Sequence, residues 1–133
     1  MLKITIPIYF SMRKRNKKTQ KVEDKDFLVW MNLYRNLHFQ VSNKMKEHYH
    51  ELIKKQIHWE KFEKIKPYYR LYIKNKLTDW WNVIAIMEKF LLDWLVENQV
   101  IKNDTYDIVV GHWWADYYLD KENPRCEVII DDI

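Results

Sequence analysis

The stretch that most constrains the fold is residues 78–107, which opens with the polar pair Thr78-Asp79 and continues as a largely apolar run to about Asn98. Its apolar residues recur at spacings of three and four: Val83, Ile84, Met87, Phe90, Leu91, Trp94 and Leu95. This period predicts a helix of about sixteen residues, roughly 24 Å long, with one buried face. Asp79 stands at its start and Asp104 lies in the polar turn after its end. The two carboxylates can meet only if the chain doubles back along the helix or the helix is broken.

The rest of the chain alternates between strand-like and helical patterns. Alternation of apolar and polar residues predicts strands at 2–10, 68–74, 106–118 and 126–131, and the short apolar run at 27–31 predicts another. Pro7 suggests an edge position or a bulge in the first strand. A second helix is expected over 33–57, with an apolar stripe of Leu37, Val41, Met45, Tyr49 and Leu52. The sequence therefore predicts a single α+β domain spanning 1–133, with a small mixed sheet packed against two main helices and a basic loop, 11–25, inserted after the first strand.

Composition narrows the function classes. A hydrophobic content of 47% with 32% charged residues is ordinary for a globular chain. One Gly and three Pro exclude a Gly-rich phosphate loop, so no organic cofactor is expected. The single Cys126 cannot form an internal disulfide and is expected to be a buried strand residue. No signal peptide or apolar run of membrane-spanning length is readable, which predicts a cytoplasmic protein with no membrane partner.

Charge is divided unequally along the chain. Residues 1–76 carry 19 Lys or Arg against 7 Asp or Glu, a net charge of +12, and residues 77–133 carry 4 against 12, a net charge of −8. A basic half suggests a polyanionic partner. The densest basic run predicts phosphate contacts from Arg13, Lys14, Arg15, Lys17, Lys18 and Lys21. The alternative is a solvated surface arm that binds nothing in particular.

Two further places are candidates for nucleic-acid contacts. Asn32, Arg35 and His38 cluster where the second helix is expected to begin, and free backbone N–H groups there favour an anion. Asn32 also fits a helix cap. Arg70 lies on the basic and aromatic side of the strand at 68–74. That side can lie against a nucleic-acid backbone, or it can simply face solvent.

Three short motifs occur in a distinctive order: Asp79-Trp80-Trp81-Asn82, Asp93-Trp94-Leu95 and Asn103-Asp104. With the stretches 31–38 and 120–125, they resemble the RusA-like family of phage and bacterial Holliday-junction endonucleases. That family has Asp-x-Asp-Asn at a helix start, a Lys one turn later, Asp-Ala-Leu further on, and Asp-Asp before a strand. Here Trp81 replaces the second Asp, Ala85 replaces the Lys, and the helix is about one turn longer.

The resemblance implies a RusA-like homodimer that cuts branched DNA during phage DNA recombination and repair. In that interpretation Asp79 and Asp104 hold Mg²⁺ or Mn²⁺, and Asn82 orients a ligand or a water as the third catalytic residue. Taken singly, Asp79 is also an ordinary helix cap and Asp104 an ordinary turn residue. The alternative function is a RusA-derived DNA-binding or protein-binding factor without catalysis, which Trp81 and Ala85 favour.

Overall fold

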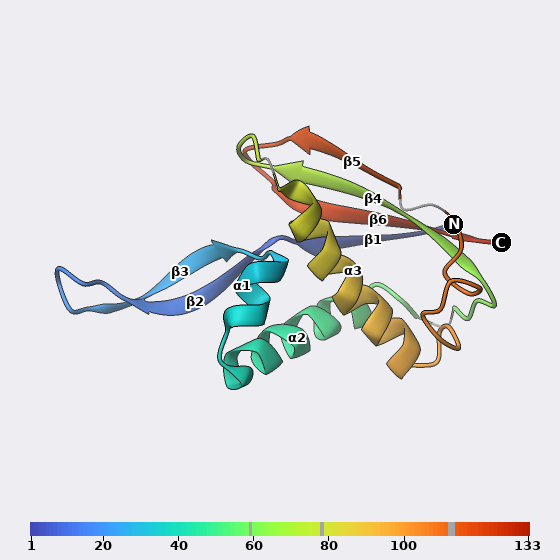
Figure 1. Ribbon diagram of the computed structural model, residues 1–133, viewed down its shortest axis with the longest axis horizontal. Helices are drawn as coiled ribbons and strands as arrows, with labels where there is room; N and C mark the ends of the chain where they lie inside the picture. Colours follow the sequence, from blue (N-terminus) through green and yellow to red (C-terminus); the bar gives the residue numbers. More distant parts are fainter. Residues whose placement is uncertain (59, 78, 112–113) are drawn as a thin grey trace.

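The computed structural model describes residues 1–58, 60–77, 79–111 and 114–133. Within these ranges a four-stranded sheet carries the helices on one of its faces, and a two-stranded hairpin extends away from it (Figure 1). The elements in chain order are β1 (Leu2–Pro7), β2 (Tyr9–Arg15), β3 (Val22–Leu28), α1 (Met31–Asn36), α2 (Phe39–Lys54), β4 (Ile65–Ile73), α3 (Trp80–Glu97), β5 (Trp114–Leu119) and β6 (Arg125–Asp132). The expected α+β class with a mixed sheet is confirmed, with one helix more than predicted.

The strand order in the sheet is β1-β6-β4-β5. β6 pairs antiparallel with both β1 and β4, whereas β4 and β5 are parallel neighbours. Parallel neighbours need a crossover connection, and α3 provides it between β4 and β5. β1 is an edge strand, which confirms the inference from Pro7.

The core lies between the sheet and the helices. All seven residues of the predicted apolar stripe in α3 are buried, and alternate residues of β4, from Ile65 to Ile73, face them. The ring of Tyr49 in α2 stacks on Phe90 in α3, with centroids 4.7 Å apart and planes 10° apart. Cys126 is buried in β6 as expected, and burial raises its thiol pKa to about 12.

The amino-terminal third differs most from the sequence prediction. The first strand ends at Pro7, and residues 11–25 form most of the hairpin β2–β3 instead of a loop. The predicted strand at 27–31 is wrong, because β3 ends at Leu28 and Met31 begins α1. Phe10, Met12 and Phe27 are apolar near the base of the hairpin, but farther out cross-strand pairs such as Lys14 with Glu23 are polar. No apolar alternation therefore runs along the whole length of these strands.

The predicted helix over 33–57 is two helices. α1 ends at Asn36, and His38 begins α2 as its N-cap, its Nδ1 accepting a hydrogen bond from the backbone N–H of Gln40 at 3.2 Å. The apolar period runs through this break because Leu37 still packs against the core. Trp30, and not Asn32, occupies the N-cap position of α1, which contradicts the cap expected at Asn32.

The predicted strand at 106–118 is also shorter in the structure. β5 covers Trp114–Leu119, and among the described residues before it Val109 makes an isolated bridge to Ile65. His112 and Trp113 of that prediction, and the cap expected at Thr78, lie outside the described residues. Within the described ranges, no helix combines the length and the apolar character needed to cross a membrane.

Candidate nucleic-acid interface

The β2–β3 hairpin gathers the basic residues that the sequence singled out. Its strands are antiparallel, with Arg15 opposite Val22 at the far end. Asn16 closes the turn, its side-chain oxygen accepting the backbone N–H of Lys18 at 2.9 Å. Gln20 adopts a positive φ of 60° that completes the reversal. The hairpin thus holds its basic end away from the body of the domain (Figure 1).

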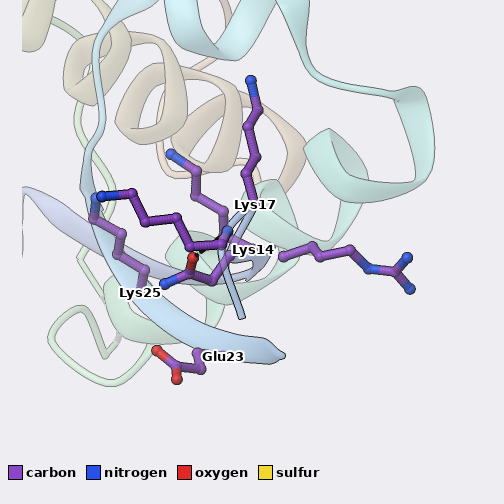
Figure 2. A pocket seen from close by; sticks show the side chains of 7 residues that line it. Lys14, Lys17, Glu23 and Lys25 are labelled. Atoms are coloured by element: carbon purple, nitrogen blue, oxygen red, sulfur yellow. Dashed lines mark hydrogen bonds between the residues drawn. The ribbon is translucent and has the colours of Figure 1, made fainter. Parts of the chain in front are cut away.

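Five cations surround one hollow at this end, with a volume of about 530 Å³ (Figure 2). Its lining consists of Lys14, Arg15, Asn16, Lys17, Lys18, Glu23 and Lys25. The ammonium groups of Lys14 and Lys25 each lie 5.8 Å from the centroid of the Phe27 ring. A single carboxylate among five cations leaves a strong positive potential, which suits a phosphate backbone.

Acidic residues compensate part of this charge nearer the base of the hairpin. Arg13 Nε lies 3.9 Å from Asp24 Oδ1, and both side chains are exposed. An exposed pair of this kind contributes little stability. The sequence predicted a phosphate contact from Arg13, and the structure places Asp24 beside it. Lys25, which cross-strand pairing places on the same face as Lys14, was not predicted from the sequence.

An apolar groove of about 580 Å³ separates the hairpin from the helices. Phe10, Met12 and Phe27 line it from the hairpin, and residues of α1 and α2 face them: Leu33, Leu37, Val41 and Lys44. Asn32 and Arg35 are exposed on α1, and the Asn32 carbonyl accepts a hydrogen bond from Asn36. His38 serves as the α2 cap. Asn32, Arg35 and His38, the predicted nucleic-acid contacts on the helices, therefore lie beside the hairpin but do not form a single cluster with its basic residues.

Arg70 lies elsewhere, on the sheet face that the helices leave uncovered. Its guanidinium sits 5.5 Å from the Tyr68 ring centroid. Its neighbours across the sheet are Glu127 on β6 and Asp116 on β5, both acidic. The predicted phosphate contact at Arg70 is thus separate from the basic hairpin and surrounded by opposing charge.

The three residues expected to form a catalytic site do not converge within the chain. Asp79 and Asn82 stand at the start of α3, which runs unbroken for 18 residues, a rise of about 27 Å. Asp104 follows the other end of α3. The N–H of Ile65, at the start of β4, donates to the Ile108 carbonyl at 2.8 Å, which holds the segment after α3 against that end of the sheet.

The two carboxylates expected to ligate a divalent cation therefore lie at opposite ends of α3. Asp79 and Asp104 are both exposed, and the Asp79 side chain makes no capping hydrogen bond to α3. Among the described residues, no group of three or more His, Cys, Asp or Glu side chains is arranged to hold a metal ion. Trp81, at the position of the second family Asp, stacks on Trp80 with ring centroids 3.8 Å apart. These residues do not fit a Mg²⁺ or Mn²⁺ site within one chain.

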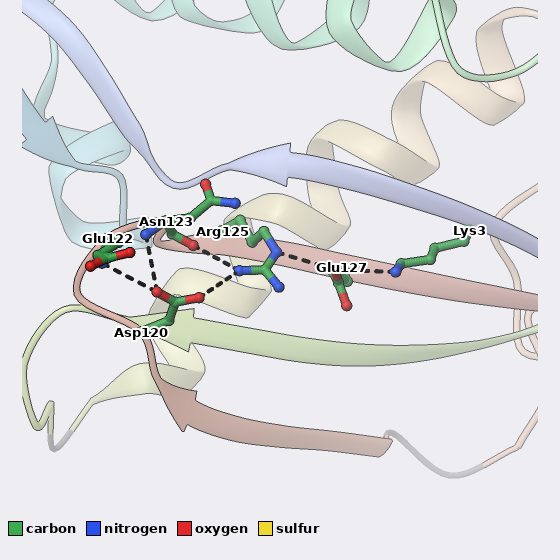
Figure 3. A network of polar contacts seen from close by, with 6 residues as sticks. All are labelled: Lys3, Asp120, Glu122, Asn123, Arg125 and Glu127. Carbon is green, nitrogen blue, oxygen red and sulfur yellow. Dashed lines mark hydrogen bonds and ion pairs between the residues drawn. The ribbon is translucent and has the colours of Figure 1, made fainter.

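The stretch 120–125 has a structural role that the sequence did not reveal (Figure 3). The Asp120 carboxylate accepts the backbone N–H groups of Glu122 and Asn123, and it pairs with Arg125 at 3.0 Å. These hydrogen bonds, first that of Asn123, lower the pKa of Asp120. They close the turn between β5 and β6.

The same network continues across the uncovered sheet face. The carboxylate of Glu127 is 3.1 Å from Arg125 and 3.2 Å from Lys3. Burial acts to raise the pKa of Glu127, but the hydrogen bonds from Lys3 and Arg125 outweigh it, so the pKa is lowered. Arg125 is thereby held at its Nε by Glu127 and at its Nη1 by Asp120.

No protein-family model matches the chain, and neither the curated proteins nor the solved structures yielded a match.

Proposed function

We propose that the protein binds branched DNA through the β2–β3 hairpin, as a RusA-derived DNA-binding factor that does not cut its substrate. The observation that carries this proposal is the hollow at the hairpin end, where five cations meet one carboxylate. Lysine and arginine on a projecting hairpin contact phosphates without reading sequence. That form of recognition suits a substrate defined by its shape, as a junction is.

The positions of the acidic residues within one chain support a factor that does not cut. Phosphodiester hydrolysis assisted by Mg²⁺ needs carboxylates that share one ion. A straight helix of 18 residues lies between Asp79 and Asp104. Metal-dependent cleavage remains the second candidate, because Asp79, Asn82 and Asp104 stand in the family's order.

The experiment measures binding of a synthetic four-way junction by fluorescence anisotropy over a series of salt concentrations. Each phosphate contact contributes about −0.9 to the slope of log K against log salt on duplex DNA. The variant Lys14→Gln/Lys17→Gln/Lys18→Gln should bind more weakly and reduce the slope by about 2.7, if each lysine neutralises one phosphate. The control removes three exposed lysines from another part of the chain: Lys54, Lys55 and Lys64.

The control variant should retain nearly the whole slope. An equal loss in both variants would contradict a hairpin interface and leave only general charge attraction. The same junction, incubated with Mg²⁺ or Mn²⁺, tests the second candidate. Nicking that disappears in Asp104→Asn would establish an endonuclease. A protein that neither binds nor nicks the junction would contradict both candidates and favour a protein partner.

A further inference from the structure

One face of the β2–β3 hairpin changes character along its length. Residues opposite each other in an antiparallel pair point to the same face, as do residues two apart along a strand. From the base outward, the face that lines the groove beside the helices carries three cross-strand pairs: Phe10 with Phe27, Met12 with Lys25, and Lys14 with Glu23. The same face is therefore apolar beside the helices and largely basic towards the turn.

The apolar groove and the basic hollow adjoin each other. Lys14 belongs to the lining of both. The ring of Phe27 lines the groove, and the ammonium groups of Lys14 and Lys25 each lie 5.8 Å from its centroid. An anion held by these two lysines would lie beside the groove. A ligand that joins anionic groups to flat apolar groups can therefore occupy both places at once.

Part of the groove wall has no role in the hydrophobic core. Phe10 and Met12 are half-buried and pack against the core. Phe27, Leu33 and Val41 are half-buried as well, but within the described part of the chain they belong neither to the core nor to the side chains packed against it. Apolar side chains that gather around a groove without serving the core mark a binding surface.

The ionised side chains around the groove favour an anionic ligand. Lys14 stands on the hairpin wall and Lys44 on the α2 wall. Among the described residues of the lining, the only carboxylate is that of Asp24, which lies 3.9 Å from Arg13 Nε. Three cations thus line the groove against one carboxylate. An apolar peptide would gain nothing from these charges, whereas a nucleic-acid strand brings a phosphate with every base.

We propose that the groove binds an unpaired nucleobase while the hairpin lysines hold the neighbouring phosphates. The ring of Phe27 provides the stacking surface, and Leu33 and Val41 form the opposite wall. Aromatic side chains beside a positively charged groove bind single-stranded nucleotides in this way, with little regard to sequence. In an intact duplex the bases are paired and stacked, so the groove cannot reach them.

This inference rests on the proposed DNA binding by the hairpin and adds the class of substrate. The preferred DNA is a branch point that exposes single-stranded nucleotides, such as a fork, a flap or a junction with unpaired bases. A fully paired junction offers the hairpin phosphates alone and leaves the groove empty.

The first test compares two four-way junctions by fluorescence anisotropy, one fully paired and one with two unpaired thymidines at the branch point. The wild type should bind the second more tightly by roughly fivefold or more, equivalent to about 1 kcal/mol, the lower limit for one stacked base. Phe27→Leu keeps an apolar side chain but removes the ring, so it should lose most of this preference. Its salt slope should stay unchanged, because stacking neutralises no phosphate.

Tyr106→Leu is the matched control. Tyr106 is 91% exposed, on the segment after α3 that lies at the end of the molecule opposite the hairpin (Figure 1). This variant should keep the full preference, and circular dichroism confirms that both variants fold. A wild type without the preference, a preference retained by Phe27→Leu, or an equal loss in both variants would overturn the proposal.

Failure of the hairpin interface gives a different result. Lys14→Gln/Lys17→Gln/Lys18→Gln lowers the salt slope on the fully paired junction whether or not the groove binds a base. That slope effect without any preference for unpaired thymidines would overturn base binding alone. A wild type that binds neither junction would overturn both proposals.

The second test locates the base directly. 5-Iodouracil replaces one of the unpaired thymines, the complex is irradiated in the near ultraviolet, and the cross-linked peptide is identified by mass spectrometry. The cross-link should fall on Phe10, Met12 or Phe27, and iodouracil at a paired position should give none there. Cross-linking confined to other parts of the chain would overturn the proposal and favour a peptide as the ligand of the groove.

Discussion

Gln56 offers a sharp test of how the β1 edge is held. It follows α2, and its side-chain amide replaces a neighbouring strand by bonding the N–H and the carbonyl of Thr5. A typical hydrogen bond contributes about 0.5–1.5 kcal/mol net. Thr5 is exposed, so water replaces the lost partners and the effect lies in the lower part of the range. We expect Gln56→Ala to lower the free energy of unfolding by about 1–2 kcal/mol.

The assay is urea denaturation followed by circular dichroism, with Glu51→Ala, an exposed change on the same helix, as control. A loss no greater than that of the control would refute the assignment of Gln56 as an edge cover. The variant Gln56→Glu separates the two hydrogen bonds. It keeps an acceptor for the Thr5 N–H but loses the donor, and it sets a carboxylate against the carbonyls of Thr5 and Leu52.

The pH dependence of Gln56→Glu follows from that repulsion. The introduced carboxyl group has a higher pKa in the folded chain than in the unfolded chain, because its charged form faces two carbonyl oxygens. Its destabilisation is therefore absent below the unfolded pKa of about 4.3 and complete above the folded pKa. Urea midpoints at pH 4 and pH 7 should differ more for this variant than for the wild type.

Three further predictions concern the core and the charge network. Phe90 is fully buried and stacks on Tyr49, so Phe90→Ala should cost about 3–5 kcal/mol of unfolding free energy in urea titrations. Lys3 and Arg125 lower the pKa of Glu127 in the folded chain. The stability that Glu127 contributes is therefore present above its ordinary pKa of 4.5 and is lost as the pH falls through the lower folded value. Glu127→Gln should flatten the acid side of the curve of unfolding free energy against pH. Burial raises the pKa of the Cys126 thiol to about 12, so a thiol reagent should modify it only as fast as the chain unfolds, and rapid labelling of the native protein would contradict its burial.

The elements that sequence predicted best are those with one buried and one solvated face. α3 shows seven apolar residues at helical spacing, and the structure buries all of them. β4 alternates in the same clear way, with Tyr69, Leu71 and Ile73 inward. In both elements the hydrophobic period and the backbone period coincide, so the pattern alone specifies the geometry.

The elements that sequence missed lack that coincidence. The hairpin is largely polar on both faces over much of its length, so its strand period appears only in cross-strand pairs such as Arg13 with Asp24. The break between α1 and α2 falls at Leu37 and His38, where an apolar residue keeps the helical period although the backbone turns extended. Local patterns cannot mark such positions, because tertiary contacts determine them.

The basic residues of the candidate interface were easier to predict from sequence than the position of the two carboxylates, Asp79 and Asp104. The cations of the hairpin are neighbours in sequence, so any loop or hairpin keeps them together. Lys25 was missed because it joins Lys14 only through cross-strand pairing. Asp79 and Asp104 are separated by an entire helix, and whether they meet depends on its length and on the path of the chain after it. The family order of motifs carries no information about that path.

Restoring the missing family residues tests whether that path prevents catalysis. Trp81→Asp with Ala85→Lys rebuilds the family's acidic pair and its lysine at the start of α3, where Trp81 is 45% exposed. Asp104 remains beyond the far end of an 18-residue helix, about 27 Å along its axis. We therefore expect the double variant to fold, to bind a four-way junction about as well as the wild type, and to leave it uncut with Mg²⁺ or Mn²⁺. Metal-dependent nicking by this variant, abolished by Asp104→Asn, would contradict the separation of Asp79 and Asp104 and show that two substitutions alone had removed the activity.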